Sequence, residues 1–235
     1  MLNFLSPGNL FVFFNKINKL ITKILLPLAI VSLVFSLFLS PPDYIQGDSV
    51  RIMYVHVPSS WIALACFSLI GFLTIFNFLF KFKNSILIYK SLAPIGMSFC
   101  LISIVTGAIW GQPTWGTFWA WDARLTSMLI LLVFYILFIF SYKFIQNQNL
   151  SSKICATLAA LGIVNIFIVK YSVDFWSTLH QTSSVKILGD TSIDKSMLVP
   201  LTLMLLVFLV YCALIFLMKY RAEIIRMKKK GLKRL

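Results

Sequence analysis

Six long apolar stretches, separated by short polar segments, follow one another along the chain. Each is close to the roughly 20 residues that an α-helix needs to cross a bilayer. The pattern therefore predicts six transmembrane helices, at about 21–40, 59–80, 92–109, 125–142, 154–170 and 198–218. We expect an all-α integral membrane protein in which residues 1–235 form a single six-helix membrane domain.

Local signals mark several of the predicted helix ends. Two prolines, Pro41 and Pro42, stop the first stretch, because proline cannot continue a helix. Pro58 and the serines after it are typical of a first helical turn, so the second helix is predicted to begin there. Asp122 precedes the fourth stretch and is predicted to cap its amides. The first stretch is too long for the apolar region of a signal peptide and is expected to remain as a helix.

Composition supports the same class of protein. The chain is 60% hydrophobic and only 12% charged, whereas soluble domains are nearer half apolar and a quarter charged. All four cysteines lie inside apolar stretches, with no CxxC spacing and no histidine nearby. They indicate small buried side chains and neither a disulfide framework nor a metal site; they are Cys66, Cys100, Cys155 and Cys212.

The net charge of +14 is distributed unequally between the two sides of the predicted membrane domain. The side with both termini has sixteen Lys and Arg residues against a single acid, Glu223, and the other side has five against six. The positive-inside rule therefore predicts that both termini are cytoplasmic, or in the mitochondrial matrix. The basic cytoplasmic tail, residues 219–235, then reads as an anchor on anionic lipid rather than a nucleic-acid site.

The opposite, outer side collects the chemically unusual residues. Its three predicted loops, 41–58, 110–124 and 171–197, contain the only two histidines, His56 and His180. All six tryptophans lie in these loops or at the adjacent helix ends. Tryptophan commonly anchors proteins at both membrane interfaces, but here the inner side has none, so anchoring alone explains the pattern poorly.

Residues 110–126 are the most unusual part of the outer side. This stretch combines a carboxylate and a guanidinium, Asp122 and Arg124, with four of the six tryptophans. Glycine and proline near its start are expected to interrupt a long helix, so most of it is predicted to be an ordered loop close to the membrane. Flat apolar rings in such numbers favour a platform for a flat aromatic ligand; they are Trp110, Trp115, Trp119 and Trp121.

Two histidines on neighbouring loops narrow the chemistry. They make a poor zinc site, which needs four ligands, whereas haem supplies four nitrogens itself and needs only axial ligands. Arg124 or Arg51 on the same side can meet the haem propionates. The chain has no nucleophile elbow, P-loop or dinucleotide fingerprint, and its predicted spans hold almost no charged residues of the kind that line a transport path.

The tryptophan-rich stretch also resembles a known signature. The run Trp115-Gly-Thr-Phe-Trp119-Ala-Trp121-Asp122-Ala-Arg124-Leu125-Thr126 is similar to the WWD signature of haem-handling membrane proteins. The whole chain resembles the CcmC family within that group, through its six spans, Pro-Pro-Asp-Tyr at 41–44, the run around His56 and the histidine after the fifth span. The related CcmF and CcsA types have more spans or further histidines, so CcmC fits best.

This resemblance implies a site and a role. Residues 110–126 would bind a b-type haem, transiently and non-covalently, on the periplasmic face, and His56 and His180 would be the axial ligands of its iron. The haem would pass to the chaperone CcmE, and CcmA and CcmB, an ABC-type complex, would act with CcmD to release the loaded chaperone. The implied haem-contacting residues are Trp115, Phe118, Trp119, Trp121, Asp122 and Arg124. The signature usually has another tryptophan at the position of Phe118. Phenylalanine keeps a flat ring there but lacks the indole N–H.

Two other hypotheses remain beside this one. The chain is either a transmembrane haem transporter subunit of an ABC-type complex, or a structural docking partner that binds no haem and uses its Trp and Arg residues as an interface. No enzymatic activity is expected, although a haem-lyase-like role in loading CcmE stays open. We expect a multi-pass protein of the bacterial inner membrane, with the mitochondrial inner membrane as the alternative.

Overall fold

The computed structural model describes residues 7–80, 85–180 and 193–232, and within them it confirms six helices long and apolar enough to span a membrane. Each is longer than its apolar stretch, because polar turns continue the helix at one or both ends. A π-helix, Phe35–Leu39, continues α1, and a 3₁₀-helix, Asp48–Ile52, leads into α2. The six helices are α1 (Pro7–Val34), α2 (Met53–Phe80), α3 (Ser85–Trp115), α4 (Ala123–Phe144), α5 (Gln148–Phe175) and α6 (Lys195–Leu232).

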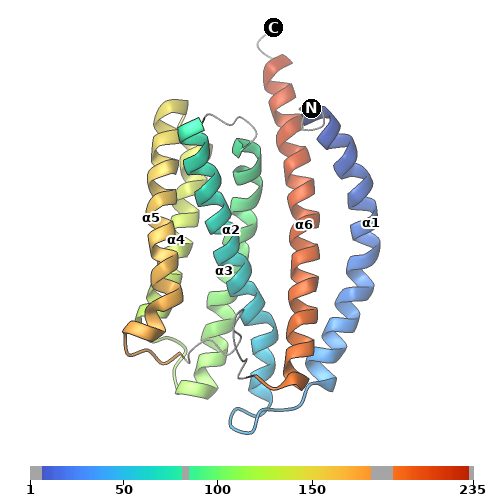
Figure 1. The fold of residues 1–235 in the computed structure, drawn as a ribbon, viewed down its shortest axis with the longest axis vertical. Coiled ribbons are helices and arrows are strands. Elements are labelled where there is room, and N and C mark those ends of the chain that lie inside the picture. The colour runs from blue at the N-terminus through green and yellow to red at the C-terminus, as the bar shows by residue number, and fades with distance from the viewer. Residues whose placement is uncertain (1–6, 81–84, 181–192, 233–235) are drawn as a thin grey trace.

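The helices form one elongated bundle (Figure 1). Helices α2 to α5 pack together, α6 packs on α2 and α3, and α1 packs mainly on α6. The start of α1 and the end of α6 lie at the same end of the bundle, and the junction between α3 and α4 lies at the opposite end (Figure 1). The basic stretch after residue 218 continues α6 as helix up to Leu232. Parts of the predicted segments, including residues 181–192 of the third outer loop, Lys81 and Lys83, lie outside the described residues.

Buried polar groups in the α2–α5 group pair with backbone carbonyls of neighbouring helices. The Tyr135 hydroxyl donates to the carbonyl of Ala63 at 2.6 Å, and the Asn165 amide donates to the carbonyl of Ser127 at 2.9 Å. Pairing matters because an unbonded polar group costs free energy in an apolar interior. Tyr135 also needs the glycine at 96, since a Cβ there would lie 2.1 Å from its hydroxyl.

The start of α2 differs from the prediction. The helix begins at Met53, so Pro58 is inside it and buried, and His56 belongs to a helix rather than to a loop. Tertiary packing explains the difference, because Tyr54 in the first turn is fully buried against Leu201 and Met204 of α6. The first predicted outer loop, 41–58, is therefore largely helical.

The end of α3 also differs from the prediction. The helix continues through Gly111 and Pro113 to Trp115, and α4 begins at Ala123, so the loop is much shorter than residues 110–126. Pro113 lies in the last turn, where it removes only one helical hydrogen bond. The residue that ends the helix is Gly116, whose φ of +76° favours glycine and whose N–H bonds the carbonyl of Gln112 at 3.0 Å.

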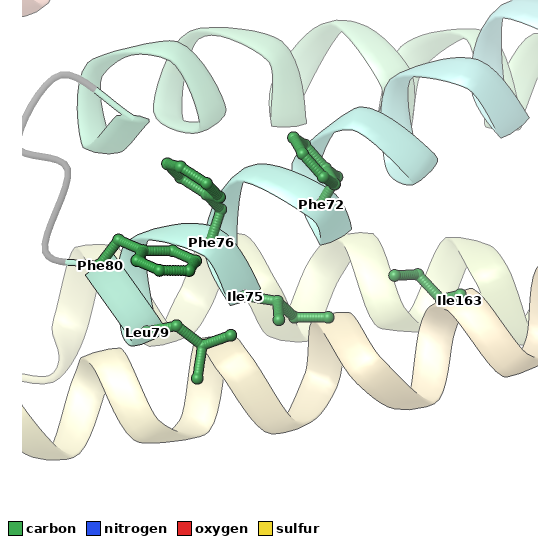
Figure 2. Close-up of a pocket in the computed structure, with 6 residues that line it drawn as sticks. All are labelled: Phe72, Ile75, Phe76, Leu79, Phe80 and Ile163. Atoms are coloured by element: carbon green, nitrogen blue, oxygen red, sulfur yellow. The ribbon is translucent and has the colours of Figure 1, made fainter.

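A groove of about 290 Å³ lies on the C-terminal half of α2, where it faces α5 (Figure 2). Its lining has no polar side chain and therefore no ligand for a metal or a polar group. It lies toward the end of the bundle opposite to the tryptophan-rich stretch, so it is separate from the candidate site; it is lined by Phe72, Ile75, Phe76, Leu79, Phe80 and Ile163.

Candidate functional site

One face of α3 surrounds His56. The four residues of this face, which we call the His56 face, follow the spacing i, i+3, i+4, i+7 and so lie on one side of the helix. The imidazole of His56 reaches this face from the second turn of α2. The His56 face consists of Ser103, Thr106, Gly107 and Trp110.

The His56 ring is held by one polar edge. Its Nδ1 lies 2.9 Å from the carbonyl oxygen of Ser103 and 3.3 Å from the hydroxyl oxygen of Thr106. A carbonyl only accepts hydrogen bonds, so Nδ1 must carry the proton. The lone pair is therefore on Nε2, which is the arrangement found in metal-binding histidines whose other nitrogen donates to the protein.

Two further contacts fix the ring from its sides. A Cβ at Gly107 would lie 2.8 Å from Cε1 of His56, so only glycine leaves room for the imidazole. The indole of Trp110 meets the ring nearly edge to face, with centroids 5.8 Å apart and planes at 70°. These contacts were missed in the sequence, because the spacing Ser-x-x-Thr-Gly-x-x-Trp in α3 shows that the four residues share a face but not that His56 packs against it.

The short loop after α3 divides the aromatic residues of the signature into two groups. Trp115 and Trp119 are partly buried, whereas Phe118 and Trp121 have 62% and 79% of their surface exposed. Trp119 and Trp121 meet edge to face with centroids 5.7 Å apart. The hydroxyl of Thr117 stabilises the loop by donating a hydrogen bond to the carbonyl of Trp119 at 2.9 Å.

Asp122 connects two parts of the site. One carboxylate oxygen accepts the N–H of Leu125 at 2.8 Å, which confirms the predicted helix cap at the start of α4. The other accepts the N–H of Leu179 at 3.2 Å and lies 4.0 Å from Nδ1 of His180. The side chain is almost buried, so these contacts replace water around the carboxylate.

His180 lies just beyond the end of α5, close to the end of α3. Its ring packs on Trp115 with centroids 4.8 Å apart. Burial, and then the positive charge of Arg124, lower the pKa of His180 from 6.5 to about 4, against the opposing effect of Asp122. His180 is therefore neutral at pH 7, the form that binds a metal.

The two predicted cationic candidates have different surroundings. Arg51 pairs with Asp48 at 3.1 Å and donates to backbone carbonyls at the end of α1, those of Leu37 and Ser40. Arg124, in the first turn of α4, interacts electrostatically with Asp122 and Asp174, and its guanidinium makes no hydrogen bond to any described residue. Arg124 is thus the cation available to a ligand near the histidines.

The donor set fits haem. Two neutral imidazoles come from different elements, and no group of three His, Cys, Asp or Glu side chains suited to a metal occurs in the described parts of the chain. That set suits an iron that brings its own four equatorial nitrogens. The indole nitrogen of Trp119 is buried without a hydrogen-bond partner among the described residues, which leaves a polar group for a ligand to satisfy.

The structure brings most of the predicted site residues together at the end of the bundle where α3 ends and α4 begins. His180, Trp115 and Asp122 are linked by the contacts above, Arg124 lies in the first turn of α4, and Trp119 lies in the same short loop as Asp122. The prediction that both histidines lie on loops was wrong for His56. Phe118 and Trp121 have no ring contact with either histidine among the described residues.

Comparisons with known proteins agree on one family. The family model described as Heme exporter protein C matches residues 1–234. Heme exporter protein C of Bradyrhizobium diazoefficiens is 37% identical over 194 residues, covering 83% of this chain and 74% of that protein. The protein of the same name from Haemophilus influenzae is 37% identical over 211 residues, covering 90% and 86%. A putative cytochrome c biosynthesis ccmC-like mitochondrial protein of Marchantia polymorpha is 38% identical over 198 residues, covering 84% of each chain.

Proposed function

This chain belongs to the Heme exporter protein C family, and from that membership and the geometry of the outer site we propose that it binds haem at the periplasmic face and delivers it to the chaperone CcmE. Membership makes the chain a haem-handling component of cytochrome c maturation and not a catalytic enzyme. It is a multi-pass inner-membrane protein, and the mitochondrial relative fits the alternative location.

The observation that carries the proposal is the pair of imidazoles beside the end of α3. Trp110 contacts His56 and Trp115 contacts His180, so both imidazoles pack on tryptophans from the last turns of α3. In this proposal Nε2 of His56 and Nε2 of His180 would hold the iron. Each remaining Nδ1 faces an acceptor of the protein, the carbonyl of Ser103 and the carboxylate of Asp122.

The other site residues have distinct roles in this proposal. Trp115 and Trp119 form the apolar wall against the macrocycle, and Arg124 pairs with a propionate through a charge-assisted bond. A b-type haem would be held only by ligation and packing, without a covalent bond to the chain. Two protein ligands leave no open position on the iron, which suits holding and transfer rather than oxygen chemistry.

Hand-over would use the exposed part of the signature. Phe118 and Trp121 present aromatic surface beyond the buried rings, where CcmE can approach the haem. The basic end of α6 would then lie in the cytoplasm, as the charge distribution predicts, near the CcmA and CcmB complex with CcmD.

The decisive experiment is purification of the chain followed by a pyridine haemochrome assay and optical spectra. We expect the wild-type protein to carry haem with a low-spin spectrum. His56→Ala and His180→Ala should each lose haem or the low-spin bands, while Trp176→Phe, a change on the same side, should keep both. If both histidine variants retained the wild-type haem load and spectrum, the ligand assignment would be wrong. A wild-type protein without haem would contradict the whole proposal.

A further inference from the structure

The loop between α1 and α2 reaches the candidate site through one hydrogen bond. Trp110 donates its indole N–H to the side-chain oxygen of Gln46 at 2.9 Å. Gln46 lies in the loop before the 3₁₀-helix that leads into α2, and His56 lies in α2 itself. Trp110 contacts the His56 ring directly. The indole of Trp110 therefore has two partners. Gln46 fixes its N–H, and its ring in turn limits the position of the His56 ring.

The loop that carries Gln46 is ordered by its own hydrogen bonds. The carboxylate of Asp43 accepts the N–H groups of Ile45 and Gln46 at 2.9 and 2.8 Å. The backbones of Asp43 and Gly47 also pair with each other in both directions, at 3.1 and 2.9 Å. Gly47 has a φ of +57°, which favours glycine and closes this turn. Gln46 is therefore presented to Trp110 by a rigid turn.

The His56 ring needs such a restraint. Its contacts with the Ser103 carbonyl and the Thr106 hydroxyl are both made by Nδ1, and hydrogen bonds at that one atom permit the ring to rotate about it. Gly107 limits the ring on one side, and the Trp110 indole limits it on another. The position of the indole thus decides which way Nε2 points, and Gln46 helps to decide the position of the indole.

We propose that Gln46 and Trp110 are positioning residues that set the orientation of the His56 imidazole and so couple the α1–α2 loop to the haem site. The inference rests on the proposed function for the role of His56 as a ligand. Neither residue touches the iron in this proposal. A movement of the loop, for instance on contact with another protein, would reach His56 through the indole.

The first test uses Trp110→Phe and Gln46→Leu in the haem-loaded protein. Each substitution removes one end of the hydrogen bond while keeping a side chain of similar shape. We expect each to shift the largest g value of the low-spin electron paramagnetic resonance signal, which reports the orientation of axial imidazoles, and to weaken haem binding roughly tenfold. Because both act on one bond, the double variant should resemble the single variants rather than their sum.

Matched controls are available on the same side of the membrane. Trp176→Phe and Gln112→Leu repeat the two chemical changes at exposed residues and should leave the signal unchanged. Gln46→Leu alters only a loop residue, so it tests the proposal even if Trp110→Phe impairs folding. Wild-type g values and haem affinity in Gln46→Leu and Trp110→Phe would overturn the positioning role, while leaving the proposed function intact.

A second readout does not depend on haem. The chain has only two histidines, so a His180→Gln background gives imidazole nitrogen NMR signals from His56 alone. We expect a single Nδ1-protonated tautomer, with a mixture of tautomers appearing on Gln46→Leu or Trp110→Phe. If the wild-type protein carried no haem, the proposed function would fail, and these spectra would still decide the inference. Unchanged spectra in both variants would overturn it.

Discussion

The carboxylate of Asp122 links the start of α4 to the segment that carries His180. It caps the helix through Leu125 and lies 4.0 Å from Nδ1 of His180 while accepting the N–H of Leu179. The same side chain therefore has a folding role and a positioning role. The two roles use different oxygens, so they can be separated experimentally.

Substitutions of Asp122 should distinguish its role as the helix cap of α4 from its role beside His180. Asparagine is as good a helix cap as aspartate, but its amide cannot accept the N–H of Leu179 with the second atom. Asp122→Asn should therefore keep thermal stability in detergent while lowering haem affinity about tenfold. Asp122→Ala should also lose about 1 kcal/mol of stability with the cap. Equal haem affinity in the wild type and Asp122→Asn would contradict a role of this carboxylate at His180.

A methyl group at Gly107 should displace His56. The added Cβ would lie 2.8 Å from Cε1 of the imidazole, too close for any side-chain contact. Alanine also raises helix propensity by about 1 kcal/mol over glycine, so a loss of stability in Gly107→Ala would come from the clash alone. We expect weaker haem binding and loss of the low-spin bands.

The matching control is Ile109→Ala on the same turn of α3, where half of the side chain is exposed. Circular dichroism of both variants checks that α3 remains folded. A Gly107→Ala protein with the wild-type optical spectrum would show that the imidazole does not occupy this place when haem is bound.

The fold and the site differed in how far the sequence could predict them. The six spans were predictable because apolar length is a local property, and so was the cap by Asp122, which acts on its own helix. The helical position of His56 was not, because the local signal at Pro58 is overridden by the burial of Tyr54 against α6. The His56 face of α3 depends on which helices pack together, which single-chain patterns do not specify.

The ionisation of His180 should respond to its two charged neighbours in opposite directions. Its pKa of about 4 is set first by burial and then by the positive charge of Arg124, while Asp122 acts to raise it. In haem-free protein, NMR titration should give a midpoint near 4, which Arg124→Gln raises and Asp122→Asn lowers further. Movement of both midpoints in the same direction would contradict this arrangement of charges.

The same pKa has a consequence for stability. The folded value of about 4 is below the ordinary 6.5, so the unfolded chain binds more protons between these values. The contribution of His180 is fully present above about pH 6.5, decreases as the pH falls, and levels off below about 4. His180→Gln should remove this part of the pH dependence when unfolding is measured across the range. An unchanged pH profile would show that His180 is not buried in the neutral form.

Arg124 is expected to recognise a propionate, and the chemistry of the haem can test this without changing the fold. The guanidinium of Arg124 makes no hydrogen bond to a described residue, and Arg51 is engaged at the end of α1. A hydrogen bond to a charged group contributes about 1.5–3 kcal/mol, so Arg124→Gln should weaken haem binding by roughly ten- to hundredfold. Haem dimethyl ester, which lacks the propionate charges, should bind the wild type with a similar loss. Because the substitution and the ester remove the same interaction, Arg124→Gln should bind haem and its ester almost equally well.

Arg51→Gln is the matched control, and it should retain the preference for the free acid. If Arg124→Gln kept that preference in titrations followed by absorbance, the propionate would have to be recognised elsewhere.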